Sequence, residues 1–371
     1  MRLSLLRPVV ALVALCALAA PASSQIKIGQ TSSFTGPVAS AVKEGTDGAR
    51  LYIDSVNAKG GVLGQQIELI SLDDKFDPKL AGENAKKLID QGVVALFFNR
   101  GTPQAQAILP LLTEHRIALI APSTGAMLLH QPVHPWVFNV RATYHKEAER
   151  AVKHLVLIGV ERIALLQSND SFGDDGAAGA LKGFTAAGKT PLMHEKYDRS
   201  KPDFGPIAPK LVKADAQAVI IVGAGTQVVD GVTAIRAAGS RAQIVTLSNN
   251  ASSGFIKGLK DEARGVVVSQ VFPHERSTSA VIVKELTDLA AAKGKGDVTP
   301  AMLEGFAGAK VLVEGLRRAG REPTRERLRA ALESFRRVDI GGMEISYSPT
   351  SHTGLEYSDL SIIGADGKFR R

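Results

Sequence analysis

Continuous apolar runs of strand length alternate with longer Ala-rich segments along nearly the whole chain. The runs include IKIGQT at 26–31, IALIAPS at 117–123 and AVIIVGAG at 218–225. Between most of them, apolar residues recur at helical spacing, and Asp77 before Pro78 is typical of a helix start. Continuous apolar strands separated by helices predict an α/β fold in which helices cover both faces of a parallel sheet, a doubly wound architecture.

The chain has 371 residues, more than a single hydrophobic core usually serves. Three segments leave one set of strand–helix units for another: FNVRATYHKEAERAV, SQVFPHERSTSA and ISYSPTSHTGLEYSDLSII. Three passages between two doubly wound lobes imply a cleft above a hinge. The predicted lobes comprise residues 25–141 with 273–346, and residues 142–272 with 347–371.

The first residues are typical of a secretory signal peptide. Arg2 and Arg7 precede an apolar stretch over 8–20, and small residues follow at 20–22. The stretch is too short to cross a bilayer as a helix. We therefore expect a cleavable signal peptide over 1–24 and a periplasmic location; the alternative is a buried N-terminal helix.

Cysteine and charge usage narrow the class of protein further. The only cysteine, Cys16, lies in the predicted signal peptide, and Leu15 before it is too bulky for a lipoprotein signal. The mature chain is thus expected to have no disulfide and no thiol chemistry. The formal net charge of +8 would suit nucleic acid. Export argues against that partner, so the charge indicates solubility and a mild bias toward anionic ligands.

No pattern points to catalysis or to a cofactor. Gly223 and Gly225 follow a strand as in a dinucleotide fingerprint, but Val228 occupies the third glycine position and Gln243 the acidic position. HExxH, CxxC, GxSxG and P-loop motifs are absent from the sequence. The prediction is a protein without enzymatic activity, cofactor or metal. The Arg-rich segment 316–337 predicts two amphipathic helices with a solvated face, or else a docking surface for an anionic partner.

Several stretches resemble the leucine/isoleucine/valine-binding family of periplasmic solute receptors that feed ABC transporters. They include IKIGQTSSFTGPVAS, the NAKGG helix stop, the DDKFDP turn and QSNDSFGDDG, and the resemblance covers the mature chain in order. It implies a type I periplasmic binding fold with three crossovers, a small-molecule ligand between the lobes, and docking on an inner-membrane ABC permease. A monomer is expected. A signalling sensor of the same fold is the alternative.

The resemblance places the ligand's carboxylate at the segment Gly101-Thr102-Pro103. Local physics agrees, because Thr102 can cap the following helix, Pro103 can start it, and free amides at a helix N-terminus favour an anion. The alternative is a capped helix without a binding role. Some relatives carry a disulfide between positions that match Phe76 and Gly101, and this chain lacks it.

Other contacts are implied in the same way. Ser123, Thr124 and Gly125 match a second ligand-contacting loop, or form a polar turn. Phe34 and Phe172 match residues that wall the cleft, or else belong to the core.

The opposite lobe departs from the family. Relatives that bind branched-chain amino acids hold the ligand's ammonium with an acidic residue, whereas this chain offers only Ala224, Ser248 and Asn249. A buried ammonium without a counter-charge is costly. Arg100 meanwhile adds a cation where relatives often place an apolar residue. Together these departures favour a carboxylate ligand without an α-ammonium.

Two alternatives concern the charges. Arg100 can instead form a salt bridge with Asp73 or Asp74, at the end of the neighbouring strand. Glu304 can instead approach the cleft and restore a negative charge, which would favour an amino acid as the ligand after all.

Overall fold

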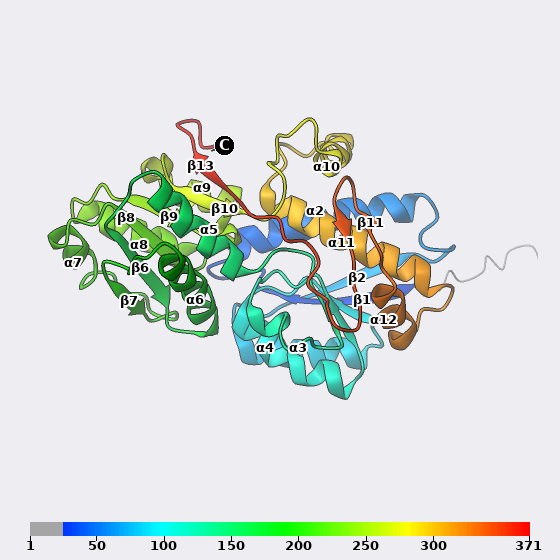
Figure 1. The fold of residues 1–371 in the computed structure, drawn as a ribbon. Coiled ribbons are helices and arrows are strands. Elements are labelled where there is room, and N and C mark those ends of the chain that lie inside the picture. Colours follow the sequence, from blue (N-terminus) through cyan, green and yellow to red (C-terminus); the bar gives the residue numbers. More distant parts are fainter. Residues whose placement is uncertain (1–24) are drawn as a thin grey trace, which may run out of the picture.

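The computed structural model describes residues 25–371, so the predicted signal peptide over 1–24 lies outside the described residues. Two α/β lobes lie side by side and are joined by extended segments (Figure 1). The predicted fold class is confirmed: each lobe is built on a mainly parallel sheet with helices on both faces.

The first lobe contains a five-stranded parallel sheet in the order β2-β1-β3-β4-β5. Helices α3 and α4 cover one side of this sheet, and α2 and α11 cover the other (Figure 1). Its strands are β1 (Ile26–Ser32), β2 (Ile67–Asp73), β3 (Ala95–Phe97), β4 (Ala118–Ile120) and β5 (Val137–Phe138). Its helices are α2 (Ala39–Ala58), α3 (Pro78–Asp90), α4 (Thr102–Glu114), α10 (Val281–Ala292), α11 (Pro300–Ala319) and α12 (Arg325–Glu333), with the short hairpin β11 (Val338–Asp339) and β12 (Glu344–Ile345).

The second lobe contains a seven-stranded sheet in the order β14-β13-β10-β9-β8-β6-β7. Its strands are β6 (Ile163–Ser168), β7 (His194–Tyr197), β8 (Ala218–Val222), β9 (Gln243–Thr246), β10 (Val267–Gln270), β13 (Asp359–Ile363) and β14 (Phe369–Arg370). Its helices are α5 (Tyr144–Leu157), α6 (Ser171–Ala186), α7 (Ala208–Lys213), α8 (Thr226–Ala237) and α9 (Ser253–Leu259).

This second sheet departs from the all-parallel prediction at one edge. Strand β13 runs antiparallel to β10, and β14 runs antiparallel to β13. The chain reaches β13 through an extended passage rather than through a crossover helix, and only a parallel connection needs such a crossover.

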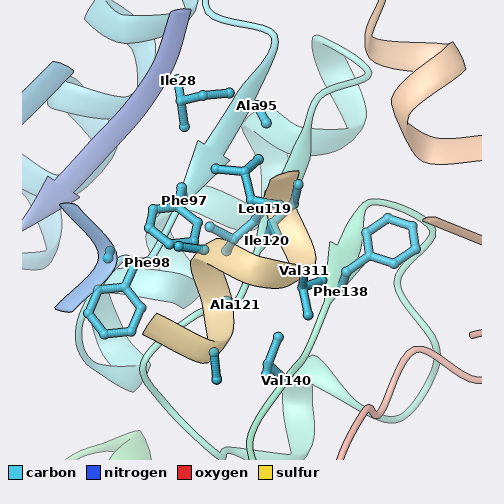
Figure 2. Packing of buried hydrophobic residues seen from close by; sticks show 14 of the residues in the cluster. Ile28, Ala95, Phe97, Phe98, Leu119, Ile120, Ala121, Phe138, Val140 and Val311 are labelled. Atoms are coloured by element: carbon cyan, nitrogen blue, oxygen red, sulfur yellow. The ribbon is translucent and has the colours of Figure 1, made fainter. Parts of the chain in front are cut away.

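The core explains why the strands read as continuous apolar runs. In the first lobe, Ile28, Leu119 and Ile120 are fully buried together with Val311 of α11 (Figure 2). In the second lobe, successive residues of β6 enter two different clusters, since Leu165 packs on one face of the sheet and Leu166 on the other. A strand buried on both faces has no polar side to show in its sequence.

Helices α2 and α11 pack unusually closely. A Cβ atom on Gly48 would lie 1.9 Å from the Met302 carbonyl oxygen, and one on Gly305 would lie 1.8 Å from the Gly45 carbonyl oxygen. This approach packs the N-terminal half of α11, which includes Glu304, directly against α2. Within residues 25–371, no helix combines the length and apolarity that crossing a bilayer requires.

Candidate functional site

A small cavity lies between the lobes, where the loops after the strands of each sheet face one another. Its free volume is about 20 Å³, room for about one water molecule. A larger solute therefore enters only when the lobes part. The first lobe contributes Phe76, Arg100, Gly101, Thr102 and Pro103 to the lining, and the second contributes Tyr144, Asp170, Phe172, Arg199, Ala224, Gln227 and Asn249.

The turn from β3 into α4 forms the first-lobe wall. Gly101 is the N-cap of α4 with a φ of 98°, so Thr102 and Pro103 are the first helical residues. The prediction that Thr102 caps this helix is wrong, because the left-handed backbone at the boundary requires the glycine one residue earlier. The Thr102 hydroxyl instead lies 2.8 Å from the Thr124 hydroxyl. The first-turn amides of α4 have no side-chain cap, which leaves this helix end suited to an anion.

Arg100 spans the cleft from this turn. Its side chain donates a hydrogen bond of 2.9 Å to the Ser123 hydroxyl within the first lobe and another to the Asn249 backbone carbonyl in the second. The residue is only 5% exposed, and burial lowers the pKa of its guanidinium below the ordinary value. Within residues 25–371, both hydrogen-bond acceptors of Arg100, a hydroxyl and a backbone carbonyl, are uncharged.

The alternative salt bridge from Arg100 to Asp73 or Asp74 is wrong. Asp73 accepts hydrogen bonds from the Thr35 hydroxyl and backbone, and Asp74 accepts them from the Ser33 hydroxyl and the backbone N–H of Phe76. Both acids thus bind the loop after β1, and they also accept the backbone N–H groups of Lys75 and Phe76 in the turn after β2. Over the described part of the chain, Arg100 has no carboxylate oxygen within 4.0 Å.

Burial raises the pKa of Asp74 to about 6, despite hydrogen bonds from Ser33 and Phe76 that favour its charged form. Burial is also the largest single effect on Asp73 and acts to raise its pKa, but the hydrogen bonds from Thr35 and Lys75 together outweigh it, so the pKa is lowered. Asp74 therefore holds the loop that carries Phe76 into the cavity at an electrostatic cost.

The loop after β4 supports the turn rather than lining the cavity. Ser123 holds Arg100, and Thr124 holds Thr102. The Gly125 carbonyl accepts the Tyr144 backbone N–H at 2.8 Å, and a Cβ atom on Gly125 would lie 2.6 Å from the Ala142 carbonyl oxygen. Gly125 therefore lets the first passage between the lobes pack against this loop.

A buried charge cluster lies at the hinge. Arg141 forms an ion pair with Glu147, donates to the Ser248 hydroxyl at 2.6 Å, and lies 3.5 Å from Glu304. Glu147 also accepts from the Ser248 backbone N–H and the Ser269 hydroxyl. Burial alone would lower the pKa of Arg141, but Glu147 and Glu304 raise it above the ordinary value. Both acids therefore lie beside Arg141, whereas the hydrogen-bond partners of Arg100 are uncharged.

The cavity brings together some of the residues expected from sequence and leaves others out. Arg100, Gly101, Thr102, Phe172, Ala224 and Asn249 line it; Phe34, Ser123, Thr124, Gly125 and Ser248 lie outside its lining. Phe172 packs edge-on to Tyr144 with ring centroids 4.9 Å apart. Phe34 is half-buried and packs against the cluster that contains both rings.

Sequence reasoning missed a second arginine. Arg199 forms an ion pair of 2.9 Å with Asp170 in its own lobe, and its guanidinium lies 4.0 Å from the centre of the Phe76 ring in the first lobe. Asp170 could have been identified from sequence, because it is a helix-capping residue that lies close to Phe172 in the chain. Arg199 follows the polar edge strand β7, whose sequence gives no strand pattern.

Phe76 and Gly101 are neighbours. A Cβ atom on Gly101 would lie 3.4 Å from the Phe76 ring, so the ring packs on the turn that contains Arg100. Between residues 25 and 371, no group of three or more acidic, His or Cys side chains is placed to hold a metal ion.

The chain matches the family model described as periplasmic binding protein over residues 25–363. It is 25% identical over 346 residues to a Leu/Ile/Val-binding protein of Rhizobium johnstonii, covering 91% of this chain and 92% of the relative.

Solved structures agree with this match. A substrate-binding periplasmic protein from Ralstonia solanacearum superposes with a TM-score of 0.86 at 31% identity, over 93% of this chain and 99% of the other. A possible leucine/isoleucine/valine-binding protein from Rhodopirellula baltica gives a TM-score of 0.88 at 27% identity, over 95% and 97%.

Proposed function

The chain belongs to the periplasmic binding protein family, in its Leu/Ile/Val-binding type, and from this premise we propose that it is the solute receptor of an ABC importer for a small organic acid. The ligand's carboxylate is held by Arg100 and the N-terminus of α4, between lobes that close on it. The proposal includes export by the segment 1–24 and docking on an inner-membrane permease.

The Arg100 side chain carries this proposal. Burying a guanidinium costs desolvation free energy. Hydrogen bonds to uncharged oxygens offset that cost less well than an opposite charge does. A carboxylate accepts two parallel hydrogen bonds from a guanidinium and supplies the missing charge. When the lobes part, the bond to the Asn249 carbonyl breaks, and a ligand carboxylate takes that place on Arg100.

The remaining cavity residues favour a compact apolar body on the acid. Phe76, Tyr144 and Phe172 supply aromatic walls, and Ala224 leaves room on the second lobe. The other pair of charges in the lining, Arg199 and Asp170, neutralises itself. Closure then follows from a higher affinity of the ligand for the closed state.

A branched-chain amino acid is the second candidate ligand, and one observation favours it. Glu304 is buried, and its Oε1 atom has no hydrogen-bond partner in the described residues, although it lies 3.5 Å from Arg141. An α-ammonium directed toward Glu304 would satisfy that oxygen. The Rhizobium relative is named for leucine, isoleucine and valine.

Titration calorimetry of the mature protein separates the two ligand classes. 4-Methylpentanoate and leucine share one carbon skeleton and differ only in the α-ammonium. We expect 4-methylpentanoate to bind and leucine to bind at least about tenfold more weakly, since the cavity lining offers no free carboxylate. Tighter binding of leucine would overturn the organic-acid proposal in favour of the amino-acid candidate.

Transport and sensing are separated in cells. Uptake of the labelled ligand should fall when the receptor is deleted and recover with the intact chain. Unchanged uptake, with loss of a ligand-dependent transcriptional response, would support the sensor role instead.

A further inference from the structure

A second and larger cavity lies on another part of the molecule. Its volume is about 710 Å³, and it shares no lining residue with the cavity that contains Arg100. One wall is α10 with the loop 293–299 that follows it; the opposite wall is α9 and the β13–β14 hairpin. In Figure 1 these walls lie near the C-terminus, where α10 faces the hairpin.

Glu275 lines this groove from the passage that leads from β10 to α10. It is 7% exposed, and its Oε2 atom has no hydrogen-bond partner within residues 25–371. The nearest basic atom is Nδ1 of His274 at 3.7 Å. That nitrogen accepts the backbone N–H of Arg276, and Nε2 of the same ring contacts the Phe369 carbonyl at 3.1 Å, so His274 has no proton to offer Glu275.

The lysines of the groove are already engaged elsewhere. Three ion pairs account for them: Lys284 with Asp288 at 2.6 Å, Lys295 with Asp47 at 2.7 Å, and Lys368 with Asp297 at 2.8 Å. Arg276 is exposed and directed to no carboxylate within 4.0 Å in the described chain. In the described residues, Glu275 is therefore a buried acid with no lysine or arginine nitrogen within 4.0 Å of its carboxylate.

The lining of the groove also includes apolar side chains. Ile256 of α9, Val283 of α10, Val298 and Phe369 contribute hydrocarbon and aromatic surface to its walls. A solute that matches this lining has one cationic group beside an apolar body.

We propose that this groove is a second binding site, which takes a small organic ammonium ion with its charged group on Glu275 and its apolar body between α10 and the β13–β14 hairpin. An ammonium group supplies three donors and the opposite charge to an acceptor that is otherwise buried and unpaired. Leaving a buried carboxylate oxygen unpaired is costly. Burial raises the pKa of Glu275 and outweighs the opposing effect of the nearby charges of His274, Arg276 and Arg371.

The probe is hexylamine, which is protonated at pH 7.5, compared with hexan-1-ol, which has the same chain and no charge. Calorimetry on the full mature chain should give saturable binding of hexylamine and none of hexan-1-ol. Equal binding of the two compounds, or no binding of hexylamine, overturns the proposal.

Two variants and a matched control locate the site. Glu275→Gln removes the charge and should weaken hexylamine binding at least about tenfold. Thr287→Trp fills the exposed rim of the groove on α10 and should weaken it as well, which keeps the test valid if Glu275→Gln fails to fold. Asp54→Asn removes an exposed acid of α2 outside the groove and should change binding less than about twofold. Unchanged hexylamine binding in Thr287→Trp, or in folded Glu275→Gln, would place the amine elsewhere and refute the proposal.

Discussion

The guanidinium of Arg100 in the first lobe donates a hydrogen bond to the backbone carbonyl of Asn249 in the second. The same side chain is anchored at its other nitrogen by the Ser123 hydroxyl. The residue that we assign to ligand capture thus also links the lobes. A ligand that replaces the Asn249 carbonyl must stabilise the closed form at least as much as the hydrogen bond that it displaces.

Arg100→Met should weaken the affinity for organic acids about 100-fold or more, because a buried charge-assisted hydrogen-bonded pair is lost. The variant should unfold at the same temperature as the native chain or a higher one, since it removes a buried cation without a counter-charge. Calorimetry and thermal unfolding measure the two effects. Ser123→Ala is the control, because it keeps the cation and removes one hydrogen bond; loss of binding as large as in Arg100→Met would argue against a direct role of the charge.

Gly254→Ala should hold the lobes apart. Gly254 lies in α9, and a Cβ atom there would lie 1.9 Å from the Ser40 hydroxyl at the start of α2. The expected result is weaker ligand binding with little change in stability, because the added methyl acts only in the closed form. Small-angle scattering should show a larger radius of gyration with ligand present.

Gly258→Ala is the matched control in the same helix, since its nearest neighbour would be a Val229 methyl at 3.2 Å. Ser40→Gly in the Gly254→Ala background should restore binding. If the two alanine variants bind equally well, the contact between α2 and α9 does not limit closure.

Stability should depend on pH through Asp74. Its pKa is raised from 3.8 to about 6 in the folded chain, mainly by burial. Between these values the folded state binds more protons than the unfolded state, so this carboxyl makes stability fall as pH rises from about 4 to 6. The cost is then complete at neutral pH and amounts to at most about 3 kcal/mol.

Asp74→Asn should remove that dependence, because an amide can still accept from Ser33 and from the Phe76 backbone. Urea unfolding at pH 4.5 and pH 7.5 measures the difference, with stabilisation expected only at the higher pH. Asp73→Asn should act in the opposite direction, since the pKa of Asp73 is lowered by its hydrogen bonds. A pH profile of Asp74→Asn that parallels the native one would contradict the raised pKa.

Glu147→Gln should destabilise the fold by about 3 kcal/mol, because it leaves Arg141 buried with a weakened partner. Glu147 is fully buried and joins the first passage between the lobes to Ser248 and Ser269. Chemical denaturation gives the value. Lys368→Met breaks an exposed pair with Asp297 and should cost less than about 1 kcal/mol; a similar cost for both variants would mean that burial does not strengthen the hinge cluster.

Local chemistry determined much of what could be predicted. The continuous apolar strands predicted α/β lobes because parallel strands buried on both faces leave a pattern in each segment by itself. Asp77 was predictable as a helix cap because the cap bond spans three residues, to the Leu80 backbone N–H. The turn after Arg100 was predictable as the N-terminus of a helix because its signals are also local in sequence. Its N-cap, however, is Gly101.

Only the tertiary structure decided the partners of the charges. Arg100 bonds to Ser123 and Asn249 rather than to Asp73 and Asp74, which are closer in sequence than Asn249. The two acids instead accept hydrogen bonds from the hydroxyls of Thr35 and Ser33 in the loop after β1. Arg199 lines the cavity just after an edge strand whose polar sequence carries no strand pattern. Such pairings form between groups far apart in the chain, so their energies depend on burial and geometry that appear only when the two lobes meet.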